Sequence, residues 1–104
     1  MQIITGGGGC GKTTELIRLC ARHGGYIVTR NQILAIDIQQ HAIKLGLNIP
    51  LPITYSEFLS GKYCGKNIKN FYIDDVDVMI SQFANGVNIN AVTFSSEQIR
   101  KFDL

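Results

Sequence analysis

The sequence predicts an α/β protein, a three-layer sandwich in which helices cover a mainly parallel β-sheet of about four strands. Two observations support this fold class. Short apolar segments of strand length alternate with longer segments of helical periodicity, and turn-forming residues separate them. A sheet of this kind binds ligands at the carboxyl ends of its strands, so residues at those ends are the first candidates for function.

Length and composition favour one compact domain over residues 1–104. Of the 104 residues, 45% are hydrophobic and 17% charged, enough for one core whose stability responds to ligands. The net charge of +2 is too small to indicate nucleic-acid binding through the overall field. We find no signal peptide or membrane-spanning stretch, and the cysteines fit no disulfide or metal pattern. These features predict a soluble cytoplasmic protein with reduced thiols and no membrane association.

The beginning of the chain has the pattern of strand, loop and helix. Residues 2–5 form a short apolar strand, and the glycines that follow favour a loop. Residues 12–23 form an amphipathic helix that Gly24-Gly25 ends. The apolar stripe of this helix comprises Leu16, Ile17, Leu19 and Cys20.

The middle of the chain continues the alternation. Residues 26–29 form a second strand, and Asn31 can cap a helix over residues 32–45. The segment from Thr54 to Glu57 fits a capping box for a short helix that ends near Ser60. The predicted buried residues of the longer helix are Ile33, Leu34, Ile36, Ile43 and Leu45.

The last part of the chain adds two strands and a helix. Residues 70–74 form a third strand and residues 76–83 a helix. After a turn at Asn85-Gly86, residues 91–94 form a fourth strand. The phenylalanines predicted to join the core are Phe58, Phe71, Phe83 and Phe94.

A glycine-rich loop carries the strongest functional signal. Residues 6–13 fit the pattern of Gly, four residues, Gly, Lys and then Ser or Thr, between a predicted strand and a predicted helix. Such a backbone can turn successive amide N–H groups and the helix start toward phosphate oxygens. Lys12 can then reach the β- and γ-phosphates of ATP, and the Thr13 hydroxyl can ligate Mg²⁺. The alternative is a glycine-rich turn with a chance lysine. The predicted nucleotide-binding residues are Gly6, Gly7, Gly8, Gly9, Cys10, Gly11, Lys12, Thr13 and Thr14.

Two aspartates follow the third predicted strand. A parallel sheet would place Asp74 beside the glycine-rich loop, where its carboxylate becomes a magnesium partner together with Thr13, either directly or through another ligand of the ion. Asp75 is placed to orient a water molecule for attack on the γ-phosphate. The alternative is a solvated turn whose aspartates begin a helix.

Together these segments resemble the first motor domain of superfamily 1 helicases, within the phosphate-loop (P-loop) NTPases that have a RecA-like core. Residues 5–16 resemble motif I, and residues 26–31 resemble motif Ia, which in that family touches single-stranded DNA. Residues 71–77 resemble motif II, and residues 92–98 resemble motif III. By this resemblance Gln98 senses the γ-phosphate, and Lys12, Asp75 and Gln98 are the predicted catalytic residues. The resemblance implies that the α/β sandwich is a minimal P-loop NTPase core.

The chain also departs from the family. The second acid of motif II is usually glutamate, and here it is the shorter Asp75. The second motor domain, with its charge-stabilising arginines, has no counterpart, so hydrolysis would be slow unless a protein partner or another protomer supplies an arginine. Arg30 and Arg100 are candidates for such a donation, with solvated surface arginines as the alternative.

One loop combines basic and aromatic residues that could contact single-stranded DNA by charge and stacking. A solvated loop is the alternative reading of this composition. The residues concerned are Lys62, Tyr63, Lys66 and Lys69.

Three functions agree with these features. The first is a weak Mg²⁺-dependent ATPase that needs a partner or self-assembly into a homo-oligomer, as an accessory to DNA replication or recombination. The second is a non-hydrolysing nucleotide-binding switch or decoy that acts on a larger protein. A small-molecule kinase ranks last, because no lid with arginines and little room for a second substrate are evident.

Overall fold

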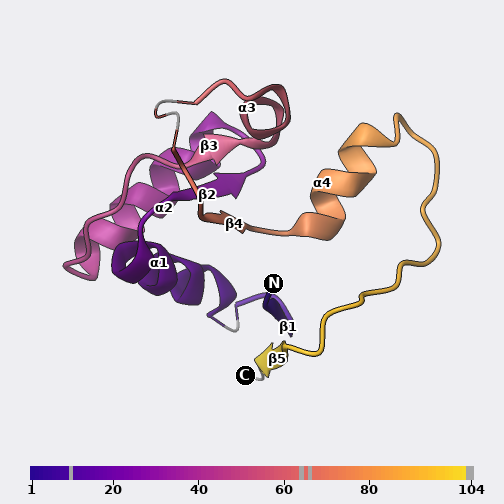
Figure 1. Ribbon diagram of the computed structural model, residues 1–104, viewed down its shortest axis with the longest axis horizontal. Helices are drawn as coiled ribbons and strands as arrows, with labels where there is room; N and C mark the ends of the chain where they lie inside the picture. The colour runs from indigo at the N-terminus through magenta and orange to yellow at the C-terminus, as the bar shows by residue number, and fades with distance from the viewer. Residues whose placement is uncertain (10, 64, 66, 103–104) are drawn as a thin grey trace.

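Helices and strands alternate along the chain, and every strand pair among the described residues is parallel. The computed structural model describes residues 1–9, 11–63, 65 and 67–102 (Figure 1). The elements are β1 (Ile3–Gly6), α1 (Lys12–His23), β2 (Tyr26–Thr29), α2 (Gln32–Lys44), β3 (Ile53–Thr54), α3 (Tyr55–Ser60), β4 (Phe71–Ile73), α4 (Val76–Phe83) and β5 (Ile99–Phe102). The predicted α/β class with a parallel arrangement is therefore confirmed.

The strands form two small sheets, where the sequence predicted one sheet of about four strands. One sheet has the order β3-β2-β4, and the other pairs β1 with β5. Within the described chain, no ladder joins β1 to β4, so the two sheets are separate hydrogen-bonded units. The short strand β3 was not predicted, because it holds only two residues between a proline-containing connection and a capped helix.

Alternation along β2 divides the core into two clusters, because successive side chains of a strand point to opposite faces. Ile27 packs with residues of α1 and α2 on one face. Val28 packs with Ile53 and with Tyr55 of α3 on the other. Strand β4 alternates likewise, since Tyr72 joins the first cluster and its neighbours join the second. This sheet therefore has helices on both faces.

The first cluster supplies much of the apolar burial. Ile17 of α1 and Ile27 of β2 are fully buried, and Ile38 of α2 is nearly so. Complete burial of one such side chain contributes about 1.5–3 kcal/mol relative to exposure. The cluster packs the middle and second half of α1 against the sheet, and the glycine-rich loop precedes this helix. Its buried members are Ile17, Cys20, Ile27, Ile38, Ala42 and Ile49.

Helix α2 buries a different face from the one predicted. Its buried residues are Ala35, Ile38 and Ala42, whereas Ile33 is 72% exposed and Ile43 69% exposed. Apolar residues occur on several sides of this helix, so periodicity alone did not select the buried face. The small alanines let α2 approach its neighbours closely, which the larger isoleucines would prevent. Of the predicted buried residues, Ile33, Ile36, Ile43 and Leu45 are exposed and Leu34 is half-buried.

The start of α3 is fixed by the predicted capping box. The Thr54 side chain accepts from the amide of Glu57, and the Glu57 carboxylate accepts from the amide of Thr54. This reciprocal pair satisfies two amide donors at the helix start. It places Tyr55, the first helical residue, with its side chain fully inside the second cluster.

The predicted strand over residues 91–94 is wrong. Residues 85–95 are exposed and irregular, and β5, residues 99–102, pairs with β1 instead. Asparagines interrupt the apolar residues before position 91, and asparagine is unfavourable in strands. Arg100 of β5 donates a hydrogen bond to Gln2, which precedes β1, and forms an ion pair with Glu15 of α1. Both contacts stabilise the pairing of β5 with β1.

The segment after α4 runs away from the rest of the molecule before it returns to β1 as β5 (Figure 1). Phe83 and Phe94 are 46% and 49% exposed, which contradicts their predicted place in the core. Phe58 and Phe71 pack edge to face with ring centroids 4.9 Å apart, as predicted for core residues. The turn at Asn85-Gly86 is confirmed, since both residues have positive φ. Among the described residues, no helix has the length and apolar character to cross a membrane.

Candidate functional site

The glycine-rich loop joins the carboxyl end of β1 to the amino end of α1. Gly9 and Gly11 have φ angles of 75° and 95°, which glycine adopts without strain. The N-cap residue of α1 is Gly11, which has no side chain to accept a hydrogen bond from the first amides of the helix. The positive end of the helix dipole and these amides together favour an anion. Cys10, also predicted to bind nucleotide, lies outside the described residues.

Lys12 turns its ammonium group back over the loop. Its Nζ donates a hydrogen bond of 2.5 Å to the carbonyl of Gly6, the last residue of β1. The side chain therefore spans the loop from the start of α1 to the end of β1. Phosphate oxygens bound inside the loop would lie within reach of the same group, which agrees with the role predicted for Lys12.

Thr13 and Asp74 meet although 61 residues separate them in sequence. The Thr13 hydroxyl lies 3.3 and 3.5 Å from the two carboxylate oxygens of Asp74 and donates to them. Strand β4 delivers Asp74 at its carboxyl end, where the amide of Asp74 extends the ladder by donating to Val28. Two hard oxygen groups, the hydroxyl of Thr13 and the carboxylate of Asp74, thus lie in contact.

Burial raises the pKa of the Asp74 carboxyl, and the neighbouring charge of Asp75 raises it further. The Thr13 hydroxyl and the charges of Lys12 and Arg30 act in the opposite direction, and they do not cancel the first two effects. The carboxylate therefore stands in an electrostatic environment that a bound cation would relieve. The donor set, one hydroxyl and one carboxylate, fits Mg²⁺.

Mg²⁺ would need further ligands at this point. Across residues 1–9, 11–63, 65 and 67–102, no cluster of three or more His, Cys, Asp or Glu residues could hold a metal ion. Mg²⁺ is commonly held by one or two protein oxygens, with phosphate oxygens and water completing the octahedron. A site made by Thr13 and Asp74 therefore depends on phosphates in the adjacent loop.

Asp75 occupies an unusual backbone conformation directly after Asp74. Its φ of 56° lies in the left-handed region, which aspartate adopts more readily than most residues but at some cost. Tyr55 holds this turn, because its hydroxyl donates to the carbonyls of Asp74 at 2.6 Å and Asp75 at 3.1 Å. The Asp75 side chain is exposed, consistent with access to water.

Burial and the nearby charges of Asp75 and Asp74 raise the pKa of Tyr55 to about 12. The phenol is therefore a stable hydrogen-bond donor at neutral pH. Sequence reasoning placed Tyr55 in the capping box but did not identify it as a support of the acidic turn. The spacing of 19 residues between Tyr55 and Asp74 gives no periodic signal for the contact.

Thr14 contacts helix α2. Its hydroxyl lies 3.1 Å from Nε2 of His41, in hydrogen-bond contact. His41 also lines a cavity of about 330 Å³, together with Thr13 and Asp75. The cavity therefore adjoins the point where Thr13 and Asp74 meet, on the side toward α2. His41 had no predicted role, since only the packing of α1 on α2 brings it here.

The structure does not bring Gln98 to the glycine-rich loop. The carbonyl of Gln98 accepts from the amide of Ile3, so Gln98 lies beside the amino end of β1. The loop follows the carboxyl end of β1, whose last residue, Gly6, is paired with Phe102. At about 3.3 Å per residue, the strand separates Gln98 from the loop by roughly 10 Å. This placement does not support contact between Gln98 and a phosphate bound in the loop.

The basic loop and the two candidate arginines have other surroundings. Tyr63 is half-buried, and its ring packs against that of Phe71 with the two centroids 5.2 Å apart. Lys66 lies outside the described residues, whereas Lys62 and Lys69 are exposed. Arg30 follows β2 and lowers the pKa of Asp74, and Arg100 forms an ion pair with Glu15.

The site thus combines a helix start whose cap residue is glycine, a lysine folded over a glycine-rich loop, and a hydroxyl–carboxylate pair at the carboxyl end of β4. No protein-family model matches this chain, and neither curated proteins nor solved structures include one significantly similar to it.

Proposed function

We propose that this chain is a Mg²⁺-dependent ATP-binding protein, a P-loop NTPase with a minimal RecA-like core. The observation that supports this proposal most directly is the contact between the Thr13 hydroxyl and the Asp74 carboxylate at 3.3 Å. Sequence pattern alone predicts Thr13 as a ligand of Mg²⁺ and Asp74 as a partner of the same ion, either directly or through another ligand, and a chance glycine turn would give them no reason to meet. The position of Lys12 over the loop supports the same assignment.

Each residue has a defined task in this proposal. The loop amides and the start of α1 bind phosphate oxygens, and the ammonium group of Lys12 neutralises their charge. Thr13 and Asp74 would hold Mg²⁺, which would supply positive charge beside the phosphates. Asp75 orients water in the cavity beside Asp74, and Tyr55 fixes the backbone of both aspartates.

Hydrolysis by this arrangement is expected to be weak. Arg100 is paired with Glu15, and Gln98 lies beside the amino end of β1, so neither is at hand to stabilise charge on a transferred phosphoryl group. An arginine supplied by a protein partner or by another copy of the chain would raise the rate by orders of magnitude. We propose that the chain acts as an accessory in DNA replication or recombination, with such a partner.

A non-hydrolysing switch or decoy is the second candidate. The placement of Gln98 favours it, because a phosphate-binding site without a γ-phosphate sensor binds nucleotide without efficient turnover. The cavity of about 330 Å³ beside Asp75 also gives a small-molecule kinase more room for an acceptor than the sequence suggested. The two candidates and the ATPase differ in what they do with the γ-phosphate.

The test measures ATP binding and phosphate release in one preparation. Isothermal titration with ATP and ADP, with and without Mg²⁺, should show Mg²⁺-dependent binding that Lys12→Ala weakens by tenfold or more. Lys44→Ala, an exposed lysine in the last turn of α2, is the matched control and should bind as the wild type does. Absence of nucleotide binding by a folded wild-type protein would refute the proposal.

Phosphate release then separates the candidates. Turnover that rises with protein concentration or with single-stranded DNA indicates the ATPase that depends on self-assembly or a partner. Binding without release of phosphate or formation of ADP under all conditions leaves the switch. ADP that forms only with an added hydroxyl or amine acceptor, with the γ-phosphoryl group transferred to that acceptor and no free phosphate released, indicates the kinase.

A further inference from the structure

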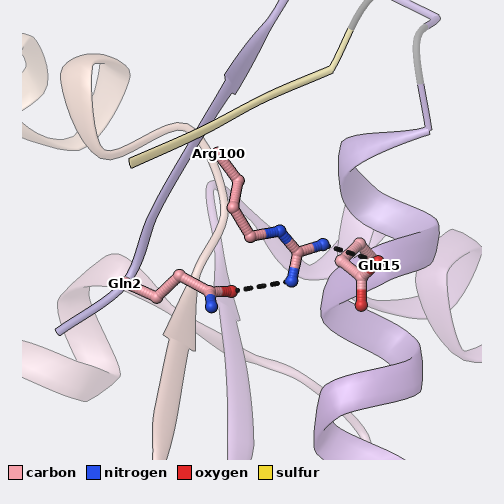
Figure 2. A network of polar contacts seen from close by, with 3 residues as sticks. All are labelled: Gln2, Glu15 and Arg100. Carbon is pink, nitrogen blue, oxygen red and sulfur yellow. Dashed lines mark hydrogen bonds and ion pairs between the residues drawn. The ribbon is translucent and has the colours of Figure 1, made fainter. Parts of the chain in front are cut away.

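Arg100 links the C-terminal strand to both arms of the glycine-rich loop. One guanidinium nitrogen lies 2.9 Å from a carboxylate oxygen of Glu15, and another donates to the side-chain oxygen of Gln2 at 3.1 Å (Figure 2). Gln2 immediately precedes β1, and Glu15 lies in the first turn of α1. The glycine-rich loop is the connection between these two elements.

Such a bridge constrains the loop without touching it. The glycines give the loop little intrinsic preference for one conformation. Its shape therefore depends on how β1 and α1 are held relative to each other. Within the described chain, β1 has only β5 as a strand partner. The Arg100 bridge adds a side-chain tie from β5 to α1.

The guanidinium group is itself well placed for this task. Arg100 is paired with Ile4 in the ladder, and its guanidinium carbon lies 5.3 Å from the centroid of the Phe102 ring. The ring and the ladder restrain the long side chain. A planar guanidinium can donate to two acceptors at once in fixed directions, which a lysine ammonium does less well.

We propose that Arg100 is a positioning residue for phosphate binding: by bridging Gln2 and Glu15, it sets the angle between β1 and α1 and so preorganises the glycine-rich loop. This inference rests on the proposed nucleotide-binding function of that loop. Arg100 acts through Glu15 and has no contact with the phosphates. Half-exposed ion pairs contribute modestly, so loss of the bridge should weaken nucleotide binding about two- to fivefold.

The experiment has two readouts, one of which needs no nucleotide. Binding of ADP and of ATP with Mg²⁺ is measured at 10 °C, with circular dichroism to establish that every variant is folded. A merely stabilising role would lower the melting temperature but leave the Kd of the folded protein unchanged. Amide NMR spectra of the free protein report the environment of Gly7, Gly8, Gly9 and Gly11.

The variants separate the effect of the bridge from the effect of the positive charge of Arg100. Arg100→Gln should raise the Kd two- to fivefold and shift the loop glycine amides, and Arg100→Lys should fall between it and the wild type. Lys101→Gln is the matched control, because it removes the same charge from the adjacent, exposed position of β5. It should change neither readout.

A double-mutant cycle tests the partnership with Glu15. Glu15→Gln combined with Arg100→Gln should weaken binding no more than Arg100→Gln alone, and the swap Glu15→Arg with Arg100→Glu should recover most of the affinity. Recovery in the double Gln variant would contradict positioning, since it would trace the loss to repulsion between phosphate and an unpaired Glu15. Unchanged Kd and unchanged glycine amides in Arg100→Gln would overturn the inference even if the wild type binds ATP. Glycine amides that shift in a protein that binds no nucleotide would retain the positioning role and reject only the proposed function.

Discussion

At the scale of single residues, the acidic turn after β4 keeps two aspartates side by side in an arrangement that is electrostatically unfavourable. Asp74 is half-buried beside another aspartate, and its pKa is raised for both reasons. Asp75 adopts a left-handed conformation that most side chains avoid. Strain and unfavourable charge of this kind persist where the surroundings enforce them and are frequent at functional sites. Tyr55 is the enforcing residue here.

Asp74→Asn should stabilise the nucleotide-free protein and abolish the effect of Mg²⁺. The folded pKa of Asp74 lies above the ordinary value of 3.8, so stability is lost as pH rises through the folded pKa, and the ionised carboxylate lowers the stability of the folded protein. Asparagine removes that charge and keeps an acceptor for the Thr13 hydroxyl. Thermal unfolding at pH 7, with and without MgATP, should show a higher Tm for the free variant and no increment from Mg²⁺.

Asp77→Asn is the control for this prediction. Asp77 is exposed in the first turn of α4, where its charge interacts favourably with the helix dipole. Its replacement should leave the response to Mg²⁺ intact and should not raise the Tm. A free Asp74→Asn protein less stable than the wild type would contradict the electrostatic account.

Tyr55→Phe should destabilise the protein by about 1–3 kcal/mol, because two carbonyl acceptors at the acidic turn lose their donor. The effect should depend on pH. The folded pKa of about 12 exceeds the ordinary value of 10, so the stabilisation is complete below pH 10 and is lost as pH rises through 12. Urea unfolding at a series of alkaline pH values should show the gap between wild type and variant closing over that range.

Tyr72→Phe provides the comparison, since the Tyr72 hydroxyl also donates to a carbonyl, that of Gly24, but in an exposed position. Its loss should cost less than that of the Tyr55 hydroxyl at pH 7. Equal losses for the two variants would show that the acidic turn does not depend on Tyr55 in particular.

At the scale of elements, local signals predicted most helices and failed where tertiary contacts decide. Helix α1 begins and ends where the pattern indicated, and the capping box of α3 is formed. A cap is a contact between near neighbours, so three or four residues specify it. The choice between residues 91–94 and residues 99–102 as the last strand depends on contacts with β1 almost the whole chain length away, and no local pattern contains them.

The junction of α1 and β2 gives a prediction that separates conformational strain from steric clash. A Cβ atom on Gly25 would lie 2.0 Å from the carbonyl oxygen of Asn70, and the Asn70 carbonyl already accepts from the amide of Tyr26. Gly24→Ala meets no atom within 4 Å and has a positive φ of 77°, so it incurs only the backbone strain, about 1–3 kcal/mol. Gly25→Ala has both costs.

We expect Gly25→Ala to exceed Gly24→Ala in destabilisation by roughly 2 kcal/mol or more, since the clash must displace the start of β4 from β2. Chemical denaturation of both variants measures the difference. Equal destabilisation by the two substitutions would indicate that Asn70 moves aside freely.

At the scale of the whole molecule, the candidate site was predictable where it follows from strand topology. Strands β2 and β4 run parallel and the first core cluster holds α1 against them, so the start of α1 lies at the carboxyl end of β4 and Thr13 meets Asp74. The same topology separates Gln98 from the loop. Strand β5 runs parallel to β1 with Ile99 opposite Ile3, so the residue before β5 lies at the amino end of β1, whereas the loop follows the carboxyl end. The resemblance supplied a role for Gln98, but a short motif holds no information about the path of the connection that precedes it.

That connection is the most accessible part of the described chain, and limited proteolysis should reveal it. Chymotrypsin cleaves after large aromatic residues, and Phe83 and Phe94 flank an exposed segment, whereas Phe58 and Phe71 pack against each other. Exposed loops are the preferred sites of nicking, so the first cuts should follow Phe83 and Phe94. Mass spectrometry of early time points identifies the cuts.

The C-terminal fragment should stay bound after nicking, because the β1–β5 ladder and the Arg100 bridge hold it to the rest of the protein. In the Arg100→Gln variant this fragment should dissociate sooner, as measured by gel filtration. Early cleavage after Phe58 or Phe71 would contradict the packing of the second cluster.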